Sequence, residues 1–391
     1  MQPLAGITVV SLEHAIAAPF ATRQLADLGA RVIKIERPGV GDFARQYDDR
    51  VRGMASHFVW VNRAKESLTL DVKNPEAHKI LERIVLEKAD VVVQNLAPGA
   101  SDRLGLSFDR LSRIKPGIIV CDISGYGANG PYRDKKAYDL LIQSESGFLS
   151  VTGTADTPCK AGPSIADISA GMYAYTNILA ALMHRQQTGQ GQHLDISMLE
   201  SLVEWTSYPL YYAFDGATPP PRTGASHATI YPYGPFPTRD GDVMLGLQNE
   251  REWRSFCTMV LQQSAMAETD AFSSNTKRVE NRDALRELIV QVFSNLPTVE
   301  ILTRLEAAKI AYARVNTMHE VWEHAQLKAR SRWTEITSPV GTLPALVPPG
   351  MDPSKTPMGA VPALGEHTDA ILVELGIETR QIEELRSIGA I

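Results

Sequence analysis

The chain has 391 residues, of which 44% are hydrophobic and 21% are charged. This composition excludes a disordered polymer, and the length suits two domains or one large α/β body with an insertion. The formal net charge of −6 argues against nucleic acid as the main partner and leaves small anionic ligands open.

The three cysteines, Cys121, Cys159 and Cys257, form no CxxC pair. They predict neither a disulfide framework nor a zinc site, so we expect no metal and a reducing, cytoplasmic setting. The opening segment MQPLAGITVVSLEHA has no basic leader region, and no later segment approaches the roughly 20 apolar residues that cross a bilayer. We therefore expect a soluble protein without a membrane partner.

The first 125 residues alternate strand and helix patterns. β-Branched runs bounded by Gly, Pro or Asp predict buried strands at residues 7–13, 31–36, 89–96 and 116–127. Apolar residues at helical spacing predict helices at residues 18–30 and 74–89. Strands that alternate with helices imply an α/β fold with a Rossmann-like parallel sheet covered on both faces.

A long helical pattern follows at residues 169–187, and an alternating run at 193–198 is typical of a strand. The segment TGQGQ between them has two glycines, but it comes after a helix and before a strand. This order is the reverse of a dinucleotide-binding turn. We interpret the segment as a tight connection and expect no nucleotide cofactor.

The Pro- and Gly-rich segment at 214–225 predicts a linker. Beyond it, residues 231–247 have the pattern of a hairpin, and helical segments are expected at 250–262, 277–295 and 298–309. We therefore expect a large Rossmann-like domain (1–215), a smaller α+β domain (225–330) and a return segment (331–391) that completes the large domain.

Asp167 stands at the head of the long helix, in GPSIADISAG. Local sequence favours a helix cap, because Asp is a preferred capping residue and its charge suits the positive end of a helix. The same helix end would hold the carboxylate ionised at neutral pH, so that it could act as a nucleophile. The two roles do not exclude each other. The chain has no Walker A loop, HExxH motif or GxSxG elbow.

Longer blocks of the chain carry a resemblance. They are GITVVSLEHAIAAPFATRQLADLGARVIKIERPGVGD, NRAKESLTLDVKNPE, NLAPGASDRLG, SGYGANGPY, the residues around Asp167 with HRQQTGQGQHLDISM, and PALGEHTDAILVELG. In this order, across nearly the whole chain, they resemble the family III CoA-transferases (the CaiB/BaiF family), which include formyl-CoA:oxalate and carnitine CoA-transferases.

The resemblance implies that Asp167 attacks the thioester of an acyl-CoA donor, giving a mixed anhydride and free CoA thiolate. The thiolate then forms an aspartyl-CoA thioester, and an acceptor carboxylate repeats the steps in reverse. Asp139 would have a supporting polar role near the nucleophile. Coenzyme A would be the only group carried, without metal or ATP, and the site must exclude water.

The resemblance also implies a CoA site. Four cations would meet the phosphates of CoA: Arg37, Lys73, Arg103 and Lys136. Four further residues would line the slot for adenine and pantetheine: Leu70, Asn95, Leu96 and Tyr138. His14 and Ala15 follow the first strand, at the carboxyl end where α/β proteins bind ligands. On local grounds alone each cation would be a solvated surface charge, and His14 a structural histidine.

One departure bears on the acceptor acid. The oxalate-specific branch has Gln two residues after the matching His, whereas this chain has Ile16, and we find no Gly-rich run near 225–265. These differences favour a larger acid with an apolar part. Arg222 and His227 are candidates for a second carboxylate. We expect a branched C4–C5 dicarboxylate such as itaconate, citramalate or mesaconate as acceptor, with succinyl-CoA as donor.

Two other functions compete. α-Methylacyl-CoA racemase shares the fold but pairs the Asp with a His about thirty residues earlier, where this chain has Tyr138. A phenol is a poor partner base at neutral pH. A non-catalytic CoA-binding protein would keep the cations without needing Asp167. By resemblance, we further expect a homodimer of two interlocked rings.

Overall fold

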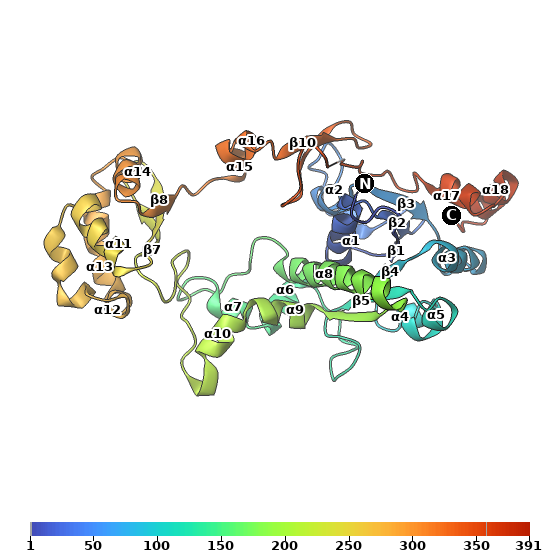
Figure 1. Cartoon of the computed structure of the whole chain (residues 1–391), viewed down its shortest axis with the longest axis horizontal. Helices are drawn as coiled ribbons and strands as arrows, with labels where there is room; N and C mark the ends of the chain where they lie inside the picture. Colours follow the sequence, from blue (N-terminus) through green and yellow to red (C-terminus); the bar gives the residue numbers. More distant parts are fainter. Residues whose placement is uncertain (1, 357) are drawn as a thin grey trace. The chain divides into compact units, whose positions relative to one another are not determined.

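The computed structural model describes residues 2–356 and 358–391, and it divides into two compact units. Unit 1 comprises Met1–Ser146, Ala161–Thr206 and Gln326–Ile391. Unit 2 comprises Gly147–Lys160 and Ser207–Ala325. Both ends of the chain therefore belong to unit 1 (Figure 1).

Unit 1 is built on a six-stranded sheet with the order β3-β2-β1-β4-β5-β6. All neighbouring strands pair in parallel. The strands are β1 (Thr8–Leu12), β2 (Arg31–Glu36), β3 (Lys65–Thr69), β4 (Val91–Gln94), β5 (Ile119–Ser124) and β6 (His193–Ser197). This is the Rossmann strand order, in which ligands bind at the carboxyl ends of the strands. The predicted α/β fold with a parallel sheet is confirmed.

Strand β3 was not among the predicted strands. β3 has the sequence KESLT, whose two charged residues obscure the apolar run. It nevertheless pairs along its full length with β2, and Lys65 lies buried among polar groups of neighbouring segments. The tertiary structure therefore overrides a weak local strand signal.

Helices cover both faces of the sheet. They include α1 (Ala17–Asp27), α2 (Ser56–Asn62), α3 (Pro75–Lys88), α4 (Ala100–Arg103), α5 (Phe108–Ile114), α6 (Asp139–Glu145), α8 (Ile165–Thr188) and α9 (Met198–Trp205), with the 3-10 helix η1 at Phe43–Gln46. The C-terminal part adds the paired strands β10 (Trp333–Ile336) and β11 (Leu343–Leu346) and the helices α16 (Ala325–Ala329), α17 (Thr368–Glu374) and α18 (Thr379–Ser387).

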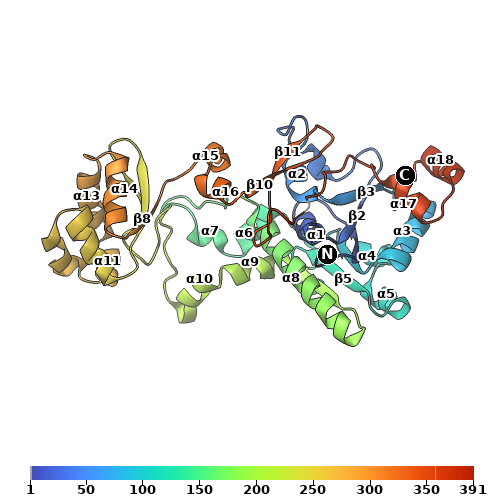
Figure 2. The ribbon, with the colours of Figure 1, turned by 45° about the horizontal axis from the view of Figure 1, so that its top comes forward.

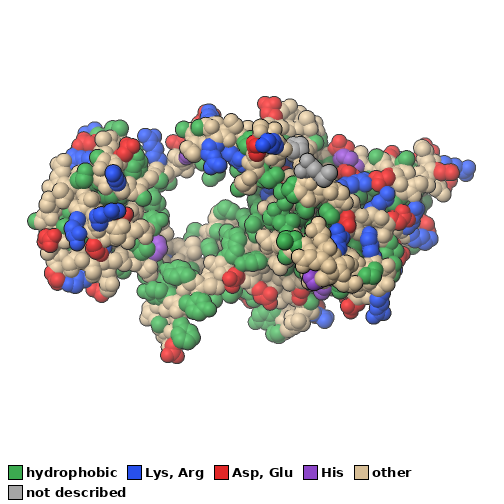
Figure 3. Space-filling model, viewed as in Figure 1, with side chains coloured by type: hydrophobic (Ala, Val, Ile, Leu, Met, Phe, Trp, Pro, Cys, Tyr) green, Lys and Arg blue, Asp and Glu red, His purple; other side chains and the backbone are tan. Residues whose placement is uncertain are grey.

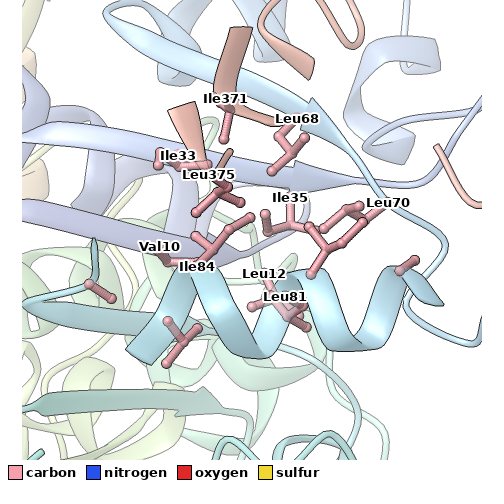
Figure 4. Close-up of a cluster of buried hydrophobic side chains, with 14 of the residues drawn as sticks. Val10, Leu12, Ile33, Ile35, Leu68, Leu70, Leu81, Ile84, Ile371 and Leu375 are labelled. Atoms are coloured by element: carbon pink, nitrogen blue, oxygen red, sulfur yellow. The ribbon is translucent and has the colours of Figure 1, made fainter. Parts of the chain in front are cut away.

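The core on one face of the sheet joins distant parts of the chain. Leu81 and Ile84 of α3 pack against Val10 of β1, and Ile371 and Leu375 of α17 belong to the same buried cluster (Figure 4). Thr368 anchors α17 to β3, because its Oγ1 accepts a hydrogen bond of 3.0 Å from the backbone N–H of Thr69. The return segment thus completes the core of unit 1.

Helices α1 and α8 pack closely against each other (Figures 1 and 2). The buried positions of α8 are mostly small: Ala166, Ser169, Ala170, Gly171, Ala174, Ile178, Ala181 and Leu182. A Cβ atom on Gly171 would lie 2.7 Å from the carbonyl oxygen of Ala17 and 2.9 Å from the Phe20 ring. Small side chains therefore let α8 approach α1, and this contact fixes the start of α8.

The TGQGQ segment is a tight connection, as predicted. Gly189 adopts a positive φ of 74° where α8 ends. A Cβ atom on Gly191 would lie 1.7 Å from the carbonyl oxygen of Ile118, so that glycine alone fits this close approach.

Unit 2 contains a three-stranded antiparallel sheet in the order β7-β8-β9. The strands β7 (Tyr233–Pro237) and β8 (Asp242–Gly246) form the predicted hairpin, and β9 (Ala311–Ala313) adds a third strand. Phe236 and Leu245 pack against Phe293 and Ile301 in the core of this unit.

The helices of unit 2 are α7 (Phe148–Val151), α10 (Ser207–Tyr212), α11 (Glu250–Ser255), α12 (Asn275–Glu280), α13 (Arg282–Phe293), α14 (Thr298–Ala307) and α15 (Met318–Trp322). They lie at all three predicted segments: α11 at 250–262, α12 and α13 in place of one helix at 277–295, and α14 at 298–309; α7, α10 and α15 lie outside them. The expected helix at 250–262 continues beyond α11 as a π-helical turn, Phe256–Val260. Short 3-10 turns lie at Phe214–Gly216, Ser264–Glu268 and Asp270–Phe272.

Replacing Gly171 by Ala tests the contact between α1 and α8. The added methyl group would collide with backbone, so we expect G171A to lower the free energy of unfolding by about 1–3 kcal/mol in urea titration. Thr176 lies exposed on the same helix and serves as control, because T176A also raises helix propensity without a collision. Equal stabilisation by both variants would contradict the steric account.

Candidate active site

The start of α8 presents Asp167. The helix begins at Ile165, and its N-cap residue Ser164 makes no capping hydrogen bond with its side chain. Instead, Oδ1 of Asp139 accepts hydrogen bonds from the backbone N–H groups of Ala166 (2.8 Å) and Asp167 (3.3 Å). The expectation that Asp167 caps the helix is therefore wrong, because Asp139 of α6 supplies the acceptor.

Asp139 is itself held by a buried amide. Nε2 of Gln143 donates a hydrogen bond of 2.6 Å to Oδ2 of Asp139, and Oε1 of Gln143 accepts one of 2.9 Å from the backbone N–H of Ala161. Gln143 is fully buried. This chain of hydrogen bonds fixes the orientation of Asp139 relative to the segment that leads into α8.

The ionisation of Asp167 also differs from the expectation. Burial of this half-buried side chain, together with the negative charge of Asp139, raises the pKa of Asp167 to about 7. The helix end was expected to hold the carboxylate ionised at neutral pH. That expectation is wrong in direction, because burial raises the pKa of Asp167 and because Asp139 occupies the amides at the helix end and adds a like charge.

A cavity of about 360 Å³ opens at the carboxyl ends of β1, β2, β3 and β4. Five residues of the predicted CoA site line it: His14, Arg37, Leu70, Lys73 and Leu96. They follow the ends of four different strands. The structure thus brings together two cations and an apolar surface, which are the groups that phosphates and a pantetheine arm would need.

The turn after β1 forms one wall of this cavity. The backbone N–H of His14 donates to Oδ1 of Asn95 (2.9 Å), and Nδ2 of Asn95 donates back to the carbonyl oxygen of His14 (2.8 Å). Ala15 follows with a positive φ of 60°, and its N–H donates to Oδ1 of Asp42 (3.1 Å). Asn95 and Ala15 therefore shape the wall without lining the cavity.

The other predicted residues of unit 1 lie elsewhere. Arg103 and Lys136 are exposed, and Tyr138 is exposed at the start of α6. Ile16 is buried and immediately precedes α1. None of these four is among the residues that line the cavity.

Arg222 and His227 belong to unit 2. The Arg222 guanidinium donates to the carbonyl oxygens of Thr154 (2.9 Å) and Ala155 (2.7 Å). Nδ1 of His227 accepts from the backbone N–H groups of Thr229 (3.2 Å) and Ile230 (3.1 Å). A role in binding the acceptor acid stays a prediction for both.

Two aromatic residues that were not predicted as site residues, Phe43 and Tyr47, form a row with His14 that begins at the cavity. Phe43 lines the cavity and stacks on His14 with ring centroids 4.9 Å apart, and Tyr47 follows at 5.9 Å from Phe43. Burial raises the pKa of Tyr47 to about 12, and the charges of Asp42 and Asp167 add to the effect. Tyr47 therefore lies within electrostatic reach of Asp167. Phe43 begins the 3-10 helix η1 and Tyr47 directly follows it, so their spacing gives no helical or strand pattern by which to predict them.

Comparison with known proteins identifies the group to which the fold and site belong. The family model described as CoA-transferase family III matches residues 4–368. The chain belongs to this family.

Relatives and a solved structure agree with the family. A succinate–glutarate CoA-transferase of Agrobacterium fabrum is 34% identical over 95% of this chain and 96% of its own length. A human succinyl-CoA:glutarate CoA-transferase is 32% identical over all of this chain and 90% of its own length. The crystal structure of a CaiB/BaiF family protein from Brucella suis superposes with a TM-score of 0.83 at 32% identity, covering 96% of this chain and 99% of that one.

Within residues 2–356 and 358–391, no group of three or more His, Cys, Asp or Glu side chains is arranged to hold a metal ion. Among the same residues, every helix is too short or too polar to cross a bilayer.

The raised pKa of Asp167 predicts the pH dependence of this CoA-transferase. Because only the ionised carboxyl is a nucleophile, we expect kcat/KM to fall about tenfold per pH unit below about pH 7. D139N removes the like charge and lowers the pKa of Asp167, which moves the acidic limb of the profile to lower pH. Carbon-13 NMR of the carboxyl groups, with D167N to assign the signal, measures the pKa directly.

Asp109 serves as control for this prediction. It lies in the first turn of α5, and D109N should leave the pH profile unchanged. A titration of Asp167 near pH 4 would contradict the electrostatic account.

Proposed function

We propose that this protein transfers CoA from an acyl-CoA donor, with succinyl-CoA as first candidate, to a dicarboxylic acid through a covalent intermediate on Asp167. The observation that carries the proposal is the aromatic row of His14, Phe43 and Tyr47. The row begins at the cavity that Arg37 and Lys73 line. It ends at Tyr47, whose pKa is raised in part by the charge of Asp167. A site for CoA and a carboxylate nucleophile thus share one unit.

The chemistry follows from the Asp167 carboxylate. One of its oxygens attacks the thioester carbonyl of the donor, the C–S bond breaks, and CoA leaves as thiolate. The thiolate attacks the Asp167 acyl carbon of the mixed anhydride and releases the donor acid, leaving an aspartyl-CoA thioester. The acceptor carboxylate attacks this thioester, the C–S bond breaks, and CoA leaves as thiolate, which gives a second mixed anhydride. The thiolate then attacks the acceptor acyl carbon of this anhydride, which forms the new acyl-CoA and releases the Asp167 carboxylate. One thioester bond is broken and another of similar energy is formed, so the reaction needs no external energy source.

The half-buried position of Asp167 suits this sequence of steps. A mixed anhydride hydrolyses in water, so the nucleophile must be poorly solvated. The raised pKa of Asp167 reflects such poor solvation, together with Asp139. Asp139 stays in a supporting role, because its oxygens hold the start of α8 and contact Gln143.

The acceptor is proposed to be a dicarboxylate. The relatives named above are CoA-transferases of succinate and glutarate. Position 16 holds Ile, where the oxalate-specific branch has Gln, and this difference disfavours oxalate. Itaconate, citramalate and mesaconate are the branched candidates, and glutarate is the linear one. Arg37 and Lys73 would bind the phosphates of CoA, with Arg103 and Lys136 as proposed additional cations and Tyr138 beside the pantetheine arm.

A CoA-exchange assay by mass spectrometry tests the proposal. We expect the wild-type protein to form acyl-CoA from succinyl-CoA and at least one dicarboxylate of the panel. D167A should lower the rate on the order of 10³-fold or more, since no other nucleophile replaces the carboxylate. Hydroxylamine added with acyl-CoA should inactivate the wild type by converting Asp167 to a hydroxamate.

D109A is the matched control, because Asp109 lies in the first turn of another helix. Unchanged exchange by D167A would overturn the covalent mechanism. Activity with oxalate alone would overturn the choice of acceptor.

We also propose that the protein is a homodimer. The segment around α10 exposes five large apolar side chains, and Figure 3 shows hydrophobic atoms over this helix. They are Tyr208, Leu210, Tyr211, Tyr212 and Phe214, and Tyr211 is 79% exposed. A contiguous apolar patch of this kind is typical of an interface. Interlocking of the two chains is the arrangement that the family resemblance favours.

Sedimentation tests the dimer. We expect a mass near twice 42.9 kDa at micromolar concentration. The dissociation constant of the dimer should be at least tenfold higher in the double variant Y211D/F214D. Val299 is a single exposed apolar residue of α14, so V299D should leave the mass unchanged. A stable wild-type monomer would contradict the proposal.

A further inference from the structure

Asp42 is a buried carboxylate behind the wall of the cavity. Its Oδ1 accepts hydrogen bonds from the backbone N–H groups of Ala15 (3.1 Å) and Ala44 (2.9 Å). Its Oδ2 accepts one of 2.7 Å from Nζ of Lys34. One side chain therefore connects the turn after β1, the start of η1 and the strand β2.

The turn that Asp42 holds is strained. Ala15 has a φ of 60°, a left-handed conformation that is unfavourable for a residue with a Cβ atom. The conformation persists only where the surroundings impose it. The hydrogen bond from the Ala15 N–H to Asp42 is one such restraint, and the two bonds between His14 and Asn95 are the others.

Buried cations keep Asp42 charged. Burial alone would raise the pKa of Asp42, but the charge of Lys34 and the hydrogen bonds to this carboxylate hold the pKa well below its usual range. Nζ of Lys34 also lies 3.4 Å from Oε1 of Glu13, which pairs with Lys65 at 2.7 Å. All four side chains are fully buried. The carboxylate is therefore a rigid, ionised acceptor.

The residues next to these contacts line the cavity. His14 precedes Ala15, and Gly41 and Phe43 flank Asp42 in sequence. His14 also stacks on Phe43 at 4.9 Å. Asp42 thus connects two parts of the cavity lining, the turn at His14 and the loop of Gly41 and Phe43. Its own side chain does not line the cavity.

We propose that Asp42 is a positioning residue for CoA binding: its carboxylate holds the strained His14–Ala15 turn against the loop of Gly41 and Phe43, and so keeps the cavity in the shape that accepts CoA. This inference rests on the proposed function only in taking CoA as the ligand of the cavity.

A mutant cycle between positions 42 and 15 tests the proposal, with the dissociation constant of coenzyme A measured by titration calorimetry. D42A removes the acceptor, and we expect it to weaken CoA binding about tenfold. Glycine adopts a positive φ without strain, so A15G should make the acceptor less necessary. In the A15G background, D42A should weaken binding by about threefold or less. D42N keeps an oxygen that can accept from Ala15, and it should bind CoA more tightly than D42A.

Two further variants make the cycle decisive. D48A is the matched control, because Asp48 accepts from the N–H (2.9 Å) and Oγ (2.7 Å) of Ser56 in the following segment and does not line the cavity; it should leave CoA binding within about twofold. If D42A does not fold, the cycle is run on K34M/D42A, in which Lys34 is not left as a buried charge without Asp42.

Equal effects of D42A in the two backgrounds would overturn the positioning role, and so would unchanged CoA binding by D42A. A wild-type protein that binds CoA but exchanges none would refute the proposed transfer and leave this cycle intact. A wild-type protein that does not bind CoA would overturn both.

Discussion

The contact between the Asp139 carboxylate and the first amides of α8 is the interaction on which the chemistry of this site depends. The positive end of a helix stabilises one nearby negative charge most strongly, and Asp139 takes that place through the N–H groups of Ala166 and Asp167. The second carboxylate, on Asp167, is left half-buried beside a like charge, and its pKa rises to about 7. An anion so poorly solvated loses little when it forms a covalent bond that removes its charge.

The cavity beside His14 and Phe43 depends on charges of a different kind. Glu13, Lys34, Asp42 and Lys65 are buried together, and each carboxylate contacts a lysine. Replacing such a group by a hydrophobic one can be neutral, but removing one partner leaves a buried charge uncompensated. The shape of the cavity is therefore tied to the integrity of unit 1, whereas the two cations that line the cavity, Arg37 and Lys73, are exposed.

A feature could be predicted from the sequence where residues adjacent in the chain determine it, and could not where residues that meet only in the folded protein determine it. Strands β1 (TVVSL) and β4 (VVVQ) each contain consecutive β-branched residues and no charge, so their pattern was sufficient. Strand β3 begins with Lys65, whose charge is compensated only in the folded state. The grouping of Arg37, Leu70 and Lys73 came from family blocks, and no spacing rule would have placed them in one cavity. The ionisation of Asp167 was predicted in the wrong direction because Asp139, 28 residues earlier, is adjacent only in three dimensions.

Tyr47 completes the electrostatic account of the site. Burial and the charges of Asp42 and Asp167 raise its pKa to about 12, so that the phenol is neutral throughout the range in which Asp167 titrates. A neutral phenol adds no third negative charge near two carboxylates, and its O–H remains a donor. Tyr47 therefore does not raise the pKa of Asp167 further, and burial and Asp139 remain the causes of that shift.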